Sequence, residues 1–200
     1  MSKGQHTRQA IIEQAAQIFN VRGYSGASIE DLLRATNLTK GGIYNHFESK
    51  ESLALAAYDY AVSLYDARFR GLIAGKRNTR DRLQAFIELF RSVVDNPVME
   101  GGCPLLNTAV EADDTNPALR ARAQHTCNAW QQFIVRTITR GMELGDVRPR
   151  TDAEAVASVM IASVEGAMML TRLFTDNSHM YRATEHLSVY IESFLQEKTI

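Results

Sequence analysis

Apolar side chains recur at helical spacing along almost the whole chain. Near the start, one face of a 3.6-residue repeat collects Ile11, Ile12, Ala15, Ile18 and Phe19. The same spacing returns in longer segments, at about 50–64, 79–95, 117–144, 152–174 and 179–197. No segment alternates apolar and polar residues as a half-buried strand does. The pattern predicts an all-α protein of about nine helices.

Capping residues mark where several of these helices begin and end. Ser28, followed three residues later by Asp31, has the form of a capping box. Asn116-Pro117 places a favourable N-cap before a proline at the first helical position. Gly23 suits the left-handed backbone that ends a helix, and Asn37 tolerates the same conformation. These signals predict two short helices within residues 28–47, the second at about 39–47, joined by a tight turn.

Two short helices at this spacing are typical of a DNA-binding helix-turn-helix. On the second helix, Ile43 and Phe47 define the buried side, and Gly41, Gly42 and Asn45 lie opposite. Glycines weaken an isolated helix by about 1 kcal/mol each, but they let the backbone approach a groove closely. An asparagine amide can pair bidentately with adenine. The exposed face of this helix is therefore a candidate for reading DNA.

The candidate DNA-binding residues combine this face with nearby hydrogen-bond donors for phosphate. They are Ser28, Thr39, Lys40, Gly41, Gly42, Tyr44, Asn45, His46 and Lys50. The alternative is an ordinary helical corner with a solvated polar face. In that case Tyr44 is half-buried core and His46 is a surface histidine.

Composition excludes several classes of protein. The 200 residues are 45% apolar and 22% charged, with 12 Gly and 4 Pro, which is typical of compact domains. No run of about 18 uncharged apolar residues predicts a membrane span, and the start lacks a secretory signal. Two cysteines cannot form a disulfide framework, and no Cys/His set has zinc-site spacing. We expect a cytoplasmic protein with no metal, no cofactor and no membrane partner.

Charge is distributed unevenly, although the formal net charge is only -1. Residues 1–50 carry six basic and four acidic side chains, whereas the remaining residues carry 16 and 19. A small DNA-facing head on a larger acidic body fits this distribution.

Three stretches, Phe19–Tyr24, Ser28–Leu32 and Leu38–Leu53, resemble the N-terminal domain of the TetR/AcrR family of bacterial transcriptional regulators. The resemblance implies a helix-turn-helix DNA-binding domain at 1–48 and an effector-binding and dimerisation domain at 49–200. It implies a repressor that binds a near-palindromic operator as a homodimer, is released by a small-molecule effector, and is associated with the nucleoid. Ala27 departs from the family pattern, because a threonine that contacts phosphate is common there.

The last two long helices carry small and apolar residues that the resemblance assigns to a dimer interface. They are Val156, Val159, Met160, Ser163, Gly166, Ala167, Leu187, Tyr190, Ile191 and Phe194. The alternative for these residues is packing within one chain.

The resemblance also implies an effector cavity among the middle helices. Its candidate lining residues are Phe86, Phe90, Met99, Cys103, Asn107, Trp130, Phe133 and Met168. For any single one of them, the alternative is a packed core. Cys103 stands where some family members carry a cysteine that senses oxidants or electrophiles. A helix N-terminus would make its thiol more reactive, whereas burial would make it inert.

A different class of function stays open beside the regulator. The alternative is an all-helical small-molecule-binding or enzymatic dimer without a DNA role. We find no nucleophile paired with a base, no carboxylate cluster at metal spacing and no phosphate-binding loop, and so assign no catalytic residue. Activation in place of repression, and a DNA role outside transcription, are further alternatives.

Overall fold

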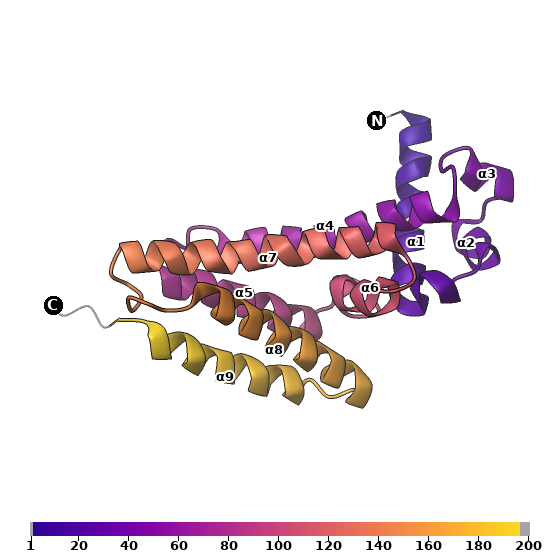
Figure 1. The fold of residues 1–200 in the computed structure, drawn as a ribbon. Coiled ribbons are helices and arrows are strands. Elements are labelled where there is room, and N and C mark those ends of the chain that lie inside the picture. Colours follow the sequence, from indigo (N-terminus) through magenta and orange to yellow (C-terminus); the bar gives the residue numbers. More distant parts are fainter. Residues whose placement is uncertain (1, 197–200) are drawn as a thin grey trace. The chain divides into compact units, whose positions relative to one another are not determined.

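A computed structural model describes residues 2–196 and shows nine α-helices within that range (Figure 1). They are α1 (Lys3–Gly26), α2 (Ile29–Thr36), α3 (Lys40–Tyr44), α4 (Lys50–Ile73), α5 (Thr79–Asp95), α6 (Pro104–Ala112), α7 (Pro117–Glu143), α8 (Ala153–Phe174) and α9 (Ser178–Phe194). The prediction of an all-α protein is confirmed. Between these helices, one isolated bridge joins Val147 to Leu195.

The capping residues act as predicted. Asp31 N–H donates to the Ser28 hydroxyl over 3.1 Å, and Ser28 N–H donates to the Asp31 carboxylate over 3.0 Å. Asn37 is left-handed, with φ 53° and ψ 35°. Gly23, with φ 75° and ψ 170°, breaks the helical backbone at the predicted point, although α1 resumes after it and ends at Gly26. Leu119 N–H donates to the Asn116 side chain over 2.9 Å at the start of α7.

Two helices are shorter than predicted. Helix α3 covers Lys40–Tyr44 in place of about 39–47, because Thr39 is its N-cap and Asn45 already closes it. Helix α9 ends at Phe194, since Leu195 turns into extended backbone. Arg148 N–H donates to the Phe194 carbonyl, and Gln196 N–H to the Asp146 carbonyl, which holds that end. Residue 197, where the last helix was predicted to end, lies outside the described part of the chain.

The chain packs as two compact units. The first takes in the chain up to Leu64 together with Met99–Thr126, and the second takes in Tyr65–Val98 and the chain from Cys127 onward. The first unit holds α1 to α3 and α6, with part of α4 and of α7. The functional division after residue 48 stays a prediction about roles.

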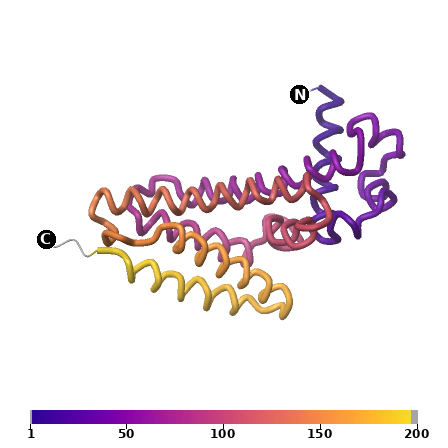
Figure 2. Tube along the Cα trace, viewed as in Figure 1, coloured from indigo at the N-terminus to yellow at the C-terminus, as the bar shows by residue number. Residues whose placement is uncertain are grey.

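The core of the first unit contains Ala54, Tyr58, Ala112 and Leu119, which α4, α6 and α7 contribute. The Tyr58 hydroxyl donates to Thr126 over 3.0 Å, which satisfies a polar group inside this core. In the second unit, α8 and α9 pack against each other and against α5 (Figure 2).

Helix α8 is long and apolar enough to span a membrane by length and composition alone, with a mean hydropathy of 1.5. Core helices of soluble proteins share that property. Here α8 buries Met160, Val164 and Met168 and packs against both α5 and α9. We interpret it as a core helix.

Candidate DNA interface and adjoining pocket

The start of α2 is fixed by a network around Asp31. Its carboxylate accepts from both the backbone and the hydroxyl of Ser28, and it pairs with Arg34 and with Arg22, the latter over 2.6 Å. The hydrogen bonds from Ser28, then the two guanidinium groups, hold the pKa of Asp31 well below its usual range. The hydroxyl of Ser28, a predicted DNA-binding residue, is therefore part of the helix cap.

Helix α3 presents one polar face and one buried face. Ile43 and Phe47 are buried, whereas Lys40, Gly41, Tyr44 and Asn45 are exposed. The Thr39 side chain accepts from Gly42 N–H over 3.2 Å, and its hydroxyl hydrogen stays available to a phosphate. His46 is half-buried.

The two glycines of α3 differ in their surroundings. A methyl group added at Gly41 would meet nothing within 4 Å, whereas one added at Gly42 would lie 3.3 Å from Leu38 Cβ. The fold itself therefore gives no reason for glycine at position 41. An outside partner that approaches the backbone closely is a reason.

Two further basic residues lie beside these elements. Lys50 donates through its ammonium to the Tyr24 carbonyl and lies 4.4 Å from the Tyr24 ring centroid, so it ties the end of α1 to the start of α4. Its predicted phosphate contact would use the remaining N–H donors. The exposed Arg8, which sequence reasoning missed, lies 4.7 Å over the Phe47 ring, next to the end of α3.

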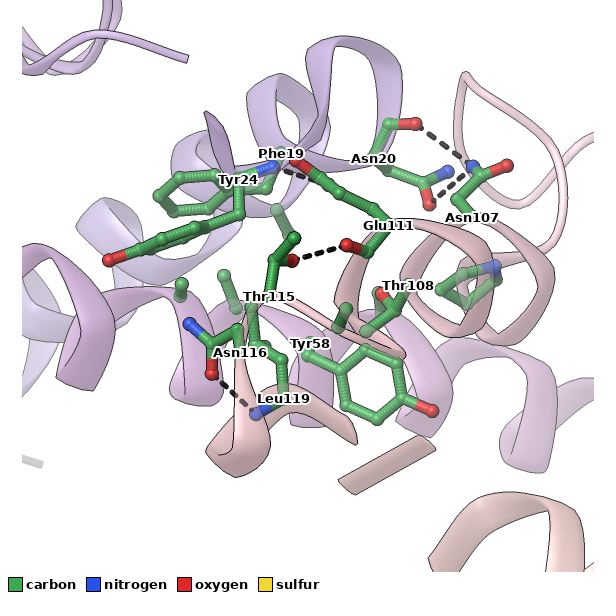
Figure 3. Close-up of a pocket in the computed structure, with 16 residues that line it drawn as sticks. Phe19, Asn20, Tyr24, Tyr58, Asn107, Thr108, Glu111, Thr115, Asn116 and Leu119 are labelled. Atoms are coloured by element: carbon green, nitrogen blue, oxygen red, sulfur yellow. Dashed lines mark hydrogen bonds between the residues drawn. The ribbon is translucent and has the colours of Figure 1, made fainter. Parts of the chain in front are cut away.

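Behind the helix-turn-helix, α6 holds the end of α1 through Glu111. The break at Gly23 frees the N–H groups of Tyr24 and Ser25, and the Glu111 carboxylate accepts both, over 2.8 and 2.7 Å. Figure 3 shows Tyr24 and Glu111 side by side. No local pattern in the sequence pairs residues so distant along the chain.

An asparagine pair makes a second connection between α1 and the turn before α6. The Asn20 amide donates to the carbonyls of Glu100 and Gly102 over 2.6 and 3.0 Å. The Asn107 amide donates to the carbonyls of Asn20 and Gly101 over 3.0 and 2.9 Å. These hydrogen bonds hold the turn before α6 against α1.

These connections border a pocket in the first unit (Figure 3). Phe19, Tyr24, Tyr58, Asn107 and Glu111 are among its lining residues. Its free space is about 40 Å³, which holds only a few water molecules. The pocket in this form is too small for an effector of ordinary size.

The predicted effector residues fall in both units. Asn107 lines the pocket of the first unit, where Met99 and Cys103 are buried. In the second unit, Phe86, Phe90, Trp130 and Phe133 form an aromatic cluster, with Trp130 5.4 Å from Phe90 between ring centroids. Met168 is buried in the same unit. A cavity of about 160 Å³ in that unit is lined in part by Phe86, Trp130 and Phe133.

Neither cysteine is exposed. Cys103 is fully buried at the N-cap of α6, and the Asn107 N–H donates to its carbonyl over 3.1 Å. Burial, and then the charge of Glu165, raise the pKa of the Cys127 thiol, which favours its inert form. Oxidant sensing at Cys103 stays a prediction that thiol labelling tests.

The predicted dimer residues divide by burial. Within the protomer, the structure buries Val156, Met160, Ala167, Leu187, Ile191 and Phe194. Their apolar faces are used by contacts among α5, α8 and α9, which is the intramolecular packing that the sequence left open. Val159 is exposed, and Ser163, Gly166 and Tyr190 are partly exposed.

Comparison with known proteins identifies the group to which this arrangement belongs. Residues 79–187 match the family model described as Tetracyclin repressor-like, C-terminal domain, and residues 11–57 match that of bacterial regulatory proteins, tetR family. The chain belongs to the TetR family. The protein is thus a DNA-binding transcriptional regulator, and its family is regulatory rather than enzymatic.

Several known proteins match this regulator over nearly its whole length. A TetR transcriptional regulator from Chloroflexus aurantiacus is 46% identical, with a TM-score of 0.94 over 98% of both chains. A TetR-family regulator from Cytophaga hutchinsonii is 37% identical, with a TM-score of 0.89 over 99% of both. The transcriptional repressor DhaR of Mycobacterium sp. (strain GP1) is 26% identical over 94% of this chain and 92% of its own. Such relatives imply a soluble cytoplasmic protein.

Proposed function

We propose that this TetR-family regulator is a repressor that binds a near-palindromic operator as a homodimer and is released by a small-molecule effector. The observation that carries the proposal is the exposed face of α3, where Lys40, Gly41, Tyr44 and Asn45 lie opposite the buried Ile43 and Phe47. A short helix so presented fits the major groove.

Within this proposal the residues divide by task. Asn45 reads base edges, because its amide offers both a donor and an acceptor at the exposed end of α3. Contacts to phosphate come from the hydroxyl, basic and imidazole groups of Thr39, Lys40, Tyr44, His46 and Lys50. Ser28, whose hydroxyl hydrogen is donated to Asp31, holds the start of α2 against the backbone of the DNA. Gly41 and Gly42 allow the backbone to come close to the groove.

The dimer interface is proposed on the outer face of α8. Val159, Ala162, Gly166, Met169 and Leu173 recur at intervals of three and four residues, and each is exposed or partly exposed. A methyl group added at Gly166 would meet nothing within 4 Å, so the protomer leaves this face open. Val189, 68% exposed on α9, adds apolar surface. Burying this seam against a second copy would make a helical interface.

Selection of genomic DNA tests the proposal. The purified protein is mixed with fragmented DNA from its source genome at near-physiological salt, and the retained fragments are sequenced. We expect a recurrent near-palindrome, with half-sites about one helical turn apart or a multiple of it. Retained fragments with a single half-site would contradict the dimer. No enrichment, at this salt or at low salt, would contradict operator binding.

A further inference from the structure

A groove rich in arginine lies in the second unit, between the start of α5 and the later turns of α7. Arg77, Arg82, Arg136 and Arg140 line it, and none of its lining residues in the described chain is acidic. Its free space is about 540 Å³, which falls in the range of small-molecule sites, about 300–1,000 Å³. Like charges gathered around an open groove repel one another, and a bound anion would relieve this repulsion.

Most of this positive charge is not neutralised by the protein. The Arg82 guanidinium donates to the Lys76 carbonyl, and Arg136 donates to the carbonyl and side-chain oxygens of Gln132, all of which are neutral acceptors. Arg140 pairs with Glu143 over 2.7 Å. Among the described residues, Arg77, Arg82 and Arg136 have no carboxylate within ion-pair distance.

Arg80, two residues before Arg82 on the same helix, provides a contrast. It pairs with Glu192 over 2.6 Å and does not line the groove. The protein therefore neutralises the arginine beside the groove and leaves two of the groove's planar guanidinium groups on α5 and α7 without a carboxylate. Such groups suit bidentate binding of a carboxylate or phosphate.

Close packing at Gly141 fixes the shape of the groove. A methyl group added there would lie 2.5 Å from the Thr79 hydroxyl and 2.6 Å from a Val147 methyl. Glycine is a poor helix former, but here it lets the first residue of α5 pack directly on α7. This approach brings Arg82 of α5 and Arg136 of α7 to one groove.

The groove shares Phe133 with the aromatic cavity of the same unit. The Arg82 guanidinium lies 5.2 Å over the Phe133 ring, and Phe69 meets the same ring edge to face at 5.0 Å. Phe86, Leu89 and Trp130 line the cavity. Its one charged lining residue is the exposed Asp66, which disfavours an anionic group at that end. A ligand that fills both spaces would have an anionic head and an apolar body.

We infer that the effector is an amphipathic organic anion, whose carboxylate or phosphate is held by Arg82 and Arg136 and whose apolar part enters the aromatic cavity past Phe133. This inference names the ligand class of the effector site, and it rests on the proposed function only for the release of DNA. Binding itself can be measured without DNA.

Trp130 gives a direct readout, because it is the only tryptophan of the chain and lines the cavity. The dimer is titrated below micelle formation with octanoate, octyl phosphate, octanol and inorganic phosphate, with tryptophan emission and titration calorimetry as readouts. One or both octyl anions should bind at least about tenfold more tightly than octanol, the factor of one charge-assisted hydrogen bond. The ratio of the affinities for octanoate and octyl phosphate identifies whether the site prefers a carboxylate or a phosphate. Equal binding of octanol, or no heat and no emission change with either anion, would overturn the inference.

Matched variants locate the head group. The double variant Arg82→Gln with Arg136→Gln should lose the preference for the octyl anions over octanol, whereas Arg80→Gln should keep it. Circular dichroism and thermal unfolding confirm that each is folded, and Arg136→Gln alone replaces the double variant if that does not fold. An unchanged preference in the groove variant would overturn the inference.

Operator binding separates this inference from the proposed function. Anions that bind through the two arginines but leave operator affinity unchanged would support the inferred site and contradict release by its ligand. Operator binding by a protein to which neither anion binds would contradict the inferred ligand class and leave the repressor proposal standing.

Discussion

Gly23 and the carboxylate of Glu111 lie in direct apposition. A methyl group added at Gly23 would lie 2.6 Å from Glu111 Oε2, and the backbone there has φ 75°. The same carboxylate accepts the N–H groups of Tyr24 and Ser25, so the glycine break and the acid form one joint between α1 and α6. Only glycine combines that conformation with that close approach.

A backbone with positive φ costs a residue other than glycine roughly 1–2 kcal/mol. Replacing Gly23 by Ala should lower the free energy of unfolding by more than this amount. The added methyl group displaces Glu111 as well. Gly75→Ala is the matched control, because Gly75 also has φ 75° but would meet nothing within 4 Å. Urea unfolding of both variants measures the difference. Equal losses would show that the contact with Glu111 contributes nothing.

Removal of the Glu111 carboxylate should expose two backbone amides. In Glu111→Ala the partly buried N–H of Tyr24 and the exposed N–H of Ser25 lose their acceptor, with a net cost of about 0.5–1.5 kcal/mol for each lost hydrogen bond. Hydrogen exchange followed by NMR should show faster exchange at these two amides, with buried amides of α9 as an internal control. Unchanged protection of Tyr24 and Ser25 would contradict the joint.

Local signals in the sequence predicted helix ends well, and they could not predict partners across the chain. Asn37 and the Asn116-Pro117 pair act within a few residues of themselves, so their roles could be identified directly. Glu111 contacts Tyr24 and Ser25, which lie 87 and 86 positions away, and nothing local marks it. Met160 and Ile191 show a related limit: apolar spacing indicates that a face is covered, but not whether the same chain or a second copy covers it.

The two glycines of α3 should separate DNA binding from stability. Gly41→Ala should raise the free energy of unfolding by up to about 1 kcal/mol, because alanine favours a helix and the methyl group meets nothing. The same methyl group should lower operator affinity by about tenfold or more, equivalent to one lost hydrogen bond. Gly42→Ala should gain less stability, since its methyl group crowds Leu38. Full operator affinity in Gly41→Ala would contradict close backbone approach.

The cap of α2 should weaken in acid. Hydrogen bonds from Ser28 and the charges of Arg34 and Arg22 lower the pKa of Asp31 in the folded protein. A carboxyl group whose pKa is lower in the folded than in the unfolded protein stabilises the fold at pH values above the ordinary carboxylate pKa, near 3.9. That stabilisation is lost as the pH falls through the pKa of the folded protein. The Asp31→Asn variant should therefore unfold at a lower temperature than the parent protein at neutral pH, and this difference in melting temperature should narrow below about pH 4. A difference in melting temperature that stays constant with pH would show that the charge of Asp31 does not stabilise the cap.

We expect Asn45 to read bases and Tyr44 to contact the phosphate backbone. Fluorescence anisotropy with the selected operator and with random DNA of equal length tests it most directly. Tyr44→Ala should weaken both complexes by the same factor and reduce the slope of affinity against salt concentration. Asn45→Ala should cost about 1–3 kcal/mol on the operator and leave random DNA unaffected. Equal losses on both DNAs for Asn45→Ala would contradict base reading by Asn45.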